Sequence, residues 1–165
     1  MNRGKLYGVG VGPGDPELLT RKAERIIRAS AVLAVPDKGA GEKTALNIIG
    51  PLADGKERLD CSTPMVRDQA VLDGAYDAAA DAICEKLDQG KDVAFITLGD
   101  PTVYSTYIYI HRRVVNRGYG AEIIPGVPSF CAVAARLNQP LCEKAQRLVI
   151  VPAAHGEVED CVNVG

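Results

Sequence analysis

The chain has 165 residues, of which 47% are hydrophobic and 24% are charged, and its formal net charge is −2. This length and balance are typical of a globular protein with one full domain and some additional chain, and the weak acidity argues against a general polyanion binder. No apolar run approaches the roughly 20 residues of a membrane span, so we expect neither a nucleic-acid partner nor a membrane partner.

Strands and helices are predicted to alternate along the first part of the chain. Residues 5–11 are expected to form a buried strand, and residues 15–30 a helix whose face carries Leu19, Ala23, Ile26 and Ile27. The next expected elements are a strand at 31–36, a helix at 42–53 and a strand at 57–63.

The clearest helical pattern covers residues 67–89. Its apolar stripe consists of Leu72, Ala75, Tyr76, Ala79, Ile83 and Leu87. The opposite stripe is acidic, with Asp73, Asp77, Asp81, Glu85 and Asp88, and we interpret it as a solvated face. Gly90 fits the position just after the end of a helix.

Residues 93–98 are apolar without alternation, which is typical of a central parallel strand that is buried on both faces. A helix at 103–117, a strand at 121–124, a helix at 128–137 and a strand at 147–152 are expected to follow. This alternation predicts an α/β fold, with an open, mostly parallel sheet and helices on both faces.

The tripeptide Gly-Asp-Pro ends two of the predicted strands, at residues 14–16 and 99–101. A local explanation is that the Asp caps the next helix and the Pro occupies the first helical position. That explanation suffices for Asp15 and Pro16, but the glycines at 8, 10, 12 and 14 exceed what one turn requires. We therefore expect these glycines, which have no side chain, to let the backbone contact a ligand directly.

A third turn, Ile-Ile-Pro-Gly-Val-Pro-Ser-Phe at residues 123–130, again places Pro-Gly at the end of a strand. Ligands of open α/β sheets bind outside the carboxyl ends of the strands. The three turns together therefore predict a small-molecule site at one edge of the sheet. The pattern Gly-x-Gly-x-x-Gly of dinucleotide sites fits poorly, because its third position falls on Pro13 or Asp15.

Three segments, VGVGPGDPELLT, LGDPTVYSTY and IPGVPSF, in this order and at these separations, resemble the tetrapyrrole (corrin/porphyrin) methylase family. Within that family, TVYSTY and PGVPSFCAVAARLNQPL are most similar to the branch that methylates carbon 20 of precorrin-2 or cobalt-precorrin-2. The resemblance implies S-adenosylmethionine-dependent methyl transfer to a reduced tetrapyrrole in cobalamin biosynthesis. It also implies a two-domain enzyme that binds its cofactor between the domains.

The resemblance carries cofactor-binding roles over to ten positions of this chain. Those positions are Pro13, Leu98, Gly99, Asp100, Val103, Tyr104, Ser105, Thr106, Pro128 and Ser129.

A proton must leave the methylated carbon, and Asp100, Tyr104 and Tyr107 are weak candidates for the catalytic base. Lys38, Lys43, Arg67 and Arg112 could pair with substrate carboxylates, although a solvated surface charge is the favoured interpretation for each. We assign no metal site to the protein.

Family members continue through a second α/β domain. We therefore expect residues 1–143 to form the amino-terminal methylase domain, and residues 144–165 to form a linker and the first strand of an incomplete second domain. On this interpretation the chain is a fragment with little or no methyl-transfer activity. The full-length enzyme is expected to be a cytoplasmic homodimer, and five cysteines without a Cys-x-x-Cys pair are consistent with a reducing compartment.

Two other function classes remain open from the sequence. A nucleotide-dependent oxidoreductase of the dinucleotide-binding class would need an acidic partner for the ribose, and only Asp37 lies near the end of the second predicted strand. The other alternative is a non-catalytic interaction domain.

Overall fold

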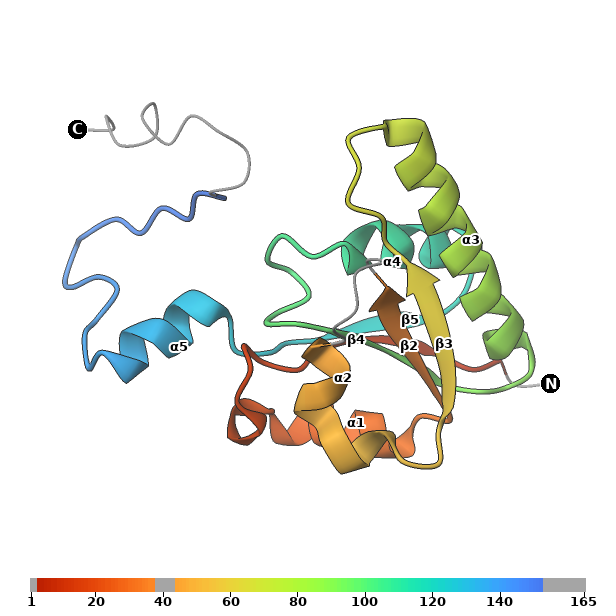
Figure 1. The fold of residues 1–165 in the computed structure, drawn as a ribbon, viewed down its shortest axis with the longest axis horizontal. Helices are drawn as coiled ribbons and strands as arrows, with labels where there is room; N and C mark the ends of the chain where they lie inside the picture. Colours follow the sequence, from red (N-terminus) through yellow and green to blue (C-terminus); the bar gives the residue numbers. More distant parts are fainter. Residues whose placement is uncertain (1–2, 38–43, 153–165) are drawn as a thin grey trace. The chain divides into compact units, whose positions relative to one another are not determined.

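The computed structural model describes residues 3–37 and 44–152 (Figure 1). The chain divides after Ser129 into a first unit, residues 1–129, and a second unit, residues 130–165. No helix in the described ranges is both long enough and apolar enough to cross a membrane.

The first unit contains a five-stranded, fully parallel sheet with the order β3-β2-β4-β1-β5. The strands are β1 (Leu6–Gly10), β2 (Val32–Asp37), β3 (Glu57–Ser62), β4 (Val93–Thr97) and β5 (Ala121–Ile124). Every residue of β4 is buried, which confirms the prediction of a central strand. Since β1 lies between β4 and β5, the carboxyl ends of these three strands are neighbours.

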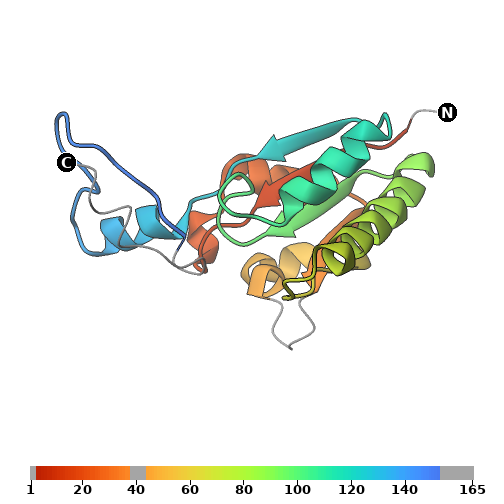
Figure 2. The same cartoon turned by 90° about the horizontal axis from the view of Figure 1, so that it is seen from above.

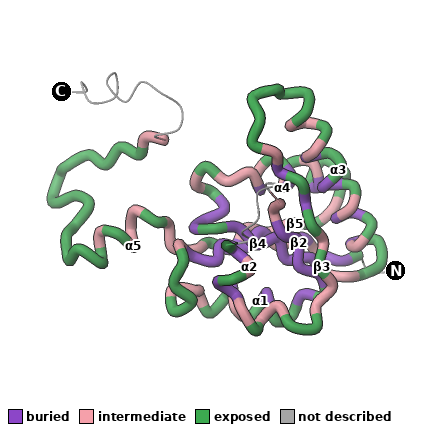
Figure 3. The backbone as a smooth tube through the Cα atoms, in the orientation of Figure 1, coloured by how far each residue is buried: buried purple, intermediate pink, exposed green. Residues whose placement is uncertain are grey.

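Two helices cover each face of the sheet (Figures 1 and 2). One apolar core lies under α1 (Arg21–Ala29) and α2 (Thr44–Ile49), and the other lies under α3 (Gln69–Asp88) and α4 (Tyr107–Asn116). Figure 3 shows the buried residues of this unit along the strands and the inner sides of these helices. The predicted α/β fold class is therefore confirmed.

Three predicted helices are shorter or interrupted. Residues 15–30 form a 3-10 helix, η1 (Pro16–Leu18), and then α1, which begins anew because the Thr20 hydroxyl accepts a hydrogen bond from the Ala23 amide. The helix predicted at 42–53 comprises α2 and a second 3-10 helix, η2 (Gly50–Ala53), within the described residues. The helix predicted from residue 103 begins only at Tyr107.

The acidic stripe of α3 is largely exposed, and arginines of the neighbouring helix α4 reach it. Arg113 donates to Asp73 at 2.6 Å and to Asp77 at 2.9 Å. Arg117 lies 2.9 Å from Asp81. These aspartates stay about half exposed or more, so the prediction of a solvated face is confirmed, with ion pairs to α4 along one side of it.

The described part of the second unit contains α5 (Ser129–Arg136), whose first residue still belongs to the first unit. Residues 147–152, where the sequence predicts a strand, are in neither a helix nor a strand. The division into domains at 143/144 remains a prediction.

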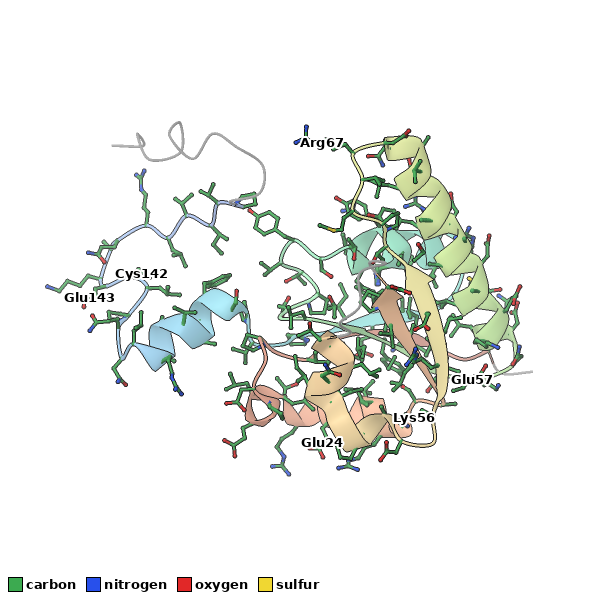
Figure 4. All side chains as sticks on the ribbon, viewed as in Figure 1. Glu24, Lys56, Glu57, Arg67, Cys142 and Glu143 are labelled. Atoms are coloured by element: carbon green, nitrogen blue, oxygen red, sulfur yellow. The ribbon has the colours of Figure 1, made fainter. Side chains whose placement is uncertain are left out.

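Two glutamates each bridge a pair of lysines on the surface of the first unit. Glu122 accepts from Lys5 and Lys22, both at 2.7 Å. Glu57, which lies beside the amino end of β3 in Figure 4, accepts from Lys86 and Lys91, also at 2.7 Å. Hydrogen bonds from these lysines lower the pKa of Glu122 and of Glu57 from 4.5 to about 2.

We expect acid to destabilise the protein through these two carboxylates. Because the folded-state pKa lies below the ordinary value, each glutamate stabilises the fold above pH 4.5, and this contribution is lost as the pH falls toward 2. Urea unfolding across this pH range should show a shallower loss of stability for Glu122→Gln than for wild type. Glu85→Gln, at an exposed position of α3, is the control, and an equal effect of both variants would contradict the prediction.

Candidate functional site

Three turns meet at the carboxyl ends of β1, β4 and β5. After β1, the Val11 amide donates to the Thr97 carbonyl at 3.0 Å. Gly12 and Gly99 then exchange two backbone hydrogen bonds, of 2.8 and 3.3 Å. The turn after β5 joins them, because the Gly126 amide donates to Asp100 Oδ2 at 3.0 Å. The convergence of these turns at one edge was predicted from their sequence and is confirmed.

The turns approach so closely that only glycine fits at two positions. A Cβ atom on Gly126 would lie 2.1 Å from the Gly99 carbonyl oxygen and 2.8 Å from the Gly10 carbonyl carbon. A Cβ atom on Gly10 would lie 2.6 Å from both the Gly126 nitrogen and the Gly99 oxygen. We refer to Gly10, Gly12, Gly99 and Gly126 as the glycine junction.

This geometry corrects the interpretation of the amino-terminal glycines. Gly8 lies against the Tyr107 ring, since a Cβ atom there would be 2.0 Å from the ring carbon Cε1. Gly10 lies against other backbone, and Gly12 has the positive φ of +80° that favours glycine. Gly14, with a φ of +147°, is the one of these four whose Cβ direction is open within 4 Å. Gly8 and Gly10 are therefore required by close packing within the protein rather than by a ligand.

Asp100 ties the second turn to the third. Its Oδ1 atom accepts from the Thr102 amide at 2.7 Å and from the Thr102 hydroxyl, and its Oδ2 atom accepts from Gly126. The residue is only 9% exposed. Asp15, in the other Gly-Asp-Pro, instead caps η1 through the Glu17 amide, as predicted. Both Asp100 oxygens have partners inside the protein. We therefore interpret Asp100 as a residue that holds the turns together rather than as the catalytic base.

The segment between β4 and α4, residues 98–106, presents apolar side chains beside this backbone. Leu98 is 49% exposed and Tyr104 is 66% exposed, while Val103 is half-buried. Tyr104 has a φ of +47°, which is costly for a residue with a Cβ atom. Ser105 faces inward, and its hydroxyl lies 3.0 Å from the hydroxyl of Thr97, a buried residue that sequence reasoning missed.

The remaining predicted residues do not all reach this edge. Tyr107 is fully buried in the core, where its hydroxyl lies 2.9 Å from His111 Nδ1. Burial raises the pKa of Tyr107, which argues against a role as the base. The other predicted residues are half-buried or exposed: Pro13, Thr106 and Pro128 are half-buried, and Ser129 is exposed at the start of α5.

The cationic candidates for substrate carboxylates are less well defined. Arg67 and Arg112 are exposed, and Arg67 lies beyond the carboxyl end of β3 in Figure 4. Lys38 and Lys43 lie outside the described residues. In the described ranges, no group of three or more His, Cys, Asp or Glu side chains could hold a metal ion.

The arrangement at this edge consists mainly of fixed backbone dipoles next to apolar side chains. Rigid peptide groups orient polar atoms of a ligand at little cost in reorganisation, and Leu98, Val103 and Tyr104 can cover an apolar body. The edge is therefore suited to positioning a small molecule that has both polar and apolar parts.

The family model of the tetrapyrrole (corrin/porphyrin) methylases matches residues 5–163. Among curated proteins, the chain is 40% identical over 149 residues to "Probable cobalt-precorrin-2 C(20)-methyltransferase" of Methanocaldococcus jannaschii, covering 90% of this chain and 64% of that protein. It is 37% identical over 158 residues to the cobalt-precorrin-2 C(20)-methyltransferase of Salmonella typhimurium, covering 94% and 66%. The chain thus spans slightly less than two thirds of the length of these relatives.

Solved structures share the fold. A cobalt precorrin-4 methyltransferase is 26% identical, with a TM-score of 0.65 over 85% of this chain and 53% of the other. A uroporphyrin-III C-methyltransferase of Thermus thermophilus is 28% identical, with a TM-score of 0.58 over 86% and 55%. Together with the family match over nearly the whole chain, these likenesses show that the chain belongs to the tetrapyrrole methylase family.

Proposed function

We propose that this chain is part of an S-adenosylmethionine-dependent C-methyltransferase of cobalamin biosynthesis, which acts on carbon 20 of precorrin-2 or cobalt-precorrin-2. The observation that carries the proposal is the glycine junction, which joins the three turns whose motifs resemble the family. The names of the two C(20)-methyltransferases at 37% and 40% identity support the choice of substrate.

The residues at the edge are consistent with binding of S-adenosylmethionine. Gly99 directly follows the exposed Leu98, and the half-buried Pro13 follows Gly12, which is hydrogen-bonded to Gly99. Such a combination of backbone and apolar groups suits a molecule with a heterocycle and a charged sulfur. Leu98, Val103 and Tyr104 would contact the cofactor. Asp100 and Ser105, which bond to other protein groups, would hold the contacting segments in position. When bound, the cofactor supplies an electrophilic methyl group on a sulfonium.

The contribution of the chain to such a reaction is mainly orientation. Holding two reactants in line can lower a barrier by about 7–11 kcal/mol in favourable cases. Fixed backbone dipoles and exclusion of water assist a reaction in which positive charge on sulfur is lost. Of the three candidates for the base, Tyr104 has the most exposed side chain, whereas Asp100 and Tyr107 are buried.

A nucleotide-dependent oxidoreductase, the alternative that the sequence leaves open, gains no support from the family match or from these relatives. We also propose that the enzyme is cytoplasmic and homodimeric. Light scattering at several protein concentrations tests the dimer.

Calorimetric titration with S-adenosylhomocysteine and, in parallel, with NAD⁺ tests the cofactor class. We expect saturable one-site binding of S-adenosylhomocysteine and no heat of binding with NAD⁺. Binding of NAD⁺ without binding of S-adenosylhomocysteine would contradict the proposal.

Gly126→Ala tests whether the glycine junction shapes the site. The added Cβ atom would meet backbone atoms of Gly99 and Gly10 that cannot rotate away, so the turns must separate. We expect the affinity for S-adenosylhomocysteine to fall about tenfold or more. Gly74→Ala is the matched control, because no atom lies within 4 Å of its Cβ position, and it should retain binding and raise stability by up to about 1 kcal/mol. Unchanged binding by Gly126→Ala would show that the junction does not control the site.

Asp100→Asn distinguishes a residue that holds the turns from a base. The asparagine NH₂ group would face a donor, either the Gly126 amide or the Thr102 amide and hydroxyl. We expect the free energy of unfolding to fall by about 1–3 kcal/mol, with weaker cofactor binding. If Asp100 acts only as the base, the variant should unfold and bind S-adenosylhomocysteine like wild type.

A further inference from the structure

The end of β4 is joined to the start of α4 by a pair of hydroxyl groups. Thr97 Oγ1 and Ser105 Oγ lie 3.0 Å apart, and Ser105 Oγ also accepts from the Tyr107 amide at 3.3 Å. Thr106, the residue before α4, makes no capping bond with its own side chain. The Ser105 hydroxyl thus links the first amide of α4 to the last residue of β4. We call the Thr97–Ser105 contact the hydroxyl clasp.

Thr97 is a rigid point of attachment. It is 8% exposed and pairs in register with Gly10 of β1, and its carbonyl accepts from the Val11 amide. Position 97 is therefore held by β1 at the buried carboxyl end of the central strand. Because the Thr97 hydroxyl is fixed in this way, it can set the position of Ser105 near the carboxyl end of the segment 98–106.

The segment that the clasp closes contains a strained residue. Tyr104 has a φ of +47°, and such conformations persist only where the surrounding contacts over-determine them. On the amino-terminal side, Asp100 holds Thr102 through two hydrogen bonds. On the carboxyl side, the hydroxyl clasp holds Ser105, the residue that follows Tyr104. Residues 103 and 104 thus lie between these two attachments, and the Val103 amide also donates to the Asp100 carbonyl at 3.2 Å.

We propose that Thr97 is a positioning residue, which acts through the Ser105 hydroxyl to hold Val103 and Tyr104 in the conformation that binds the small molecule. The identity of that molecule, S-adenosylmethionine, rests on the function proposed above. Thr97 itself does not contact it, because the side chain is buried and directed to Ser105.

Thr97→Val keeps the shape of the side chain and removes the hydroxyl, whereas Thr97→Ser keeps the hydroxyl. We expect Thr97→Val to weaken binding of S-adenosylhomocysteine about three- to tenfold, the effect of one lost hydrogen bond. Thr97→Ser should bind within about twofold of wild type. Ser105→Ala should weaken binding similarly, and the double variant should lose little more, because both substitutions break the same contact.

Ile96→Val, a conservative core substitution in the same strand, is the control for general loss of stability. It should lower the unfolding temperature without weakening binding. Weakened binding in Ile96→Val equal to that of Thr97→Val would overturn the positioning role, as would wild-type binding by both Thr97→Val and Ser105→Ala.

Hydrogen exchange of the backbone amides of residues 102–108 tests the clasp without any ligand. We expect faster exchange at the Tyr107 amide in Thr97→Val and Ser105→Ala, and wild-type exchange in Thr97→Ser. Unchanged exchange in the first two variants overturns the inference. If no protein, wild type included, binds S-adenosylhomocysteine, the proposed function is contradicted, while the exchange data still decide whether Thr97 holds the segment.

Discussion

The candidate site depends on the approach of three backbone turns to within contact distance at the carboxyl edge of the sheet. Side chains are excluded between them, as the 2.1 Å separation between a Cβ atom on Gly126 and the Gly99 oxygen shows. The buried Asp100 carboxylate completes the arrangement by accepting from the Gly126 amide. Charge-assisted hydrogen bonds in a dry environment are stronger than neutral ones, so one carboxylate can hold two turns in a single geometry.

The sheet topology makes this approach possible. With β1 between β4 and β5, three strands that are far apart in the sequence end side by side. The two apolar cores and the Arg113 and Arg117 ion pairs between α3 and α4 stabilise the layers on which the turns are built. Helices thus supply rigidity, while the residues that could contact a small molecule lie on the connections, as is common in α/β proteins.

The two Gly-Asp-Pro sequences show how one local pattern can serve two purposes. Asp15 caps a short helix within its own segment, with Glu17 two residues away. Asp100 also closes a local turn, but its second oxygen reaches Gly126, 26 residues further along the chain. Local hydrogen-bonding rules predict the first role completely. They cannot predict the second, because the partner is supplied by another strand.

The sequence by itself determined the alternation of strands and helices, the buried β4 strand and the family, since apolar periodicity and three turn motifs are local properties of the chain. It also indicated that the turns around residues 13, 100 and 126 share one edge. Only the tertiary structure decided what lies against each glycine, which carboxylates pair across helices and where the hydroxyl of Thr97 points. These outcomes depend on distances between segments remote in sequence. Packing sets such distances, and no local pattern records them.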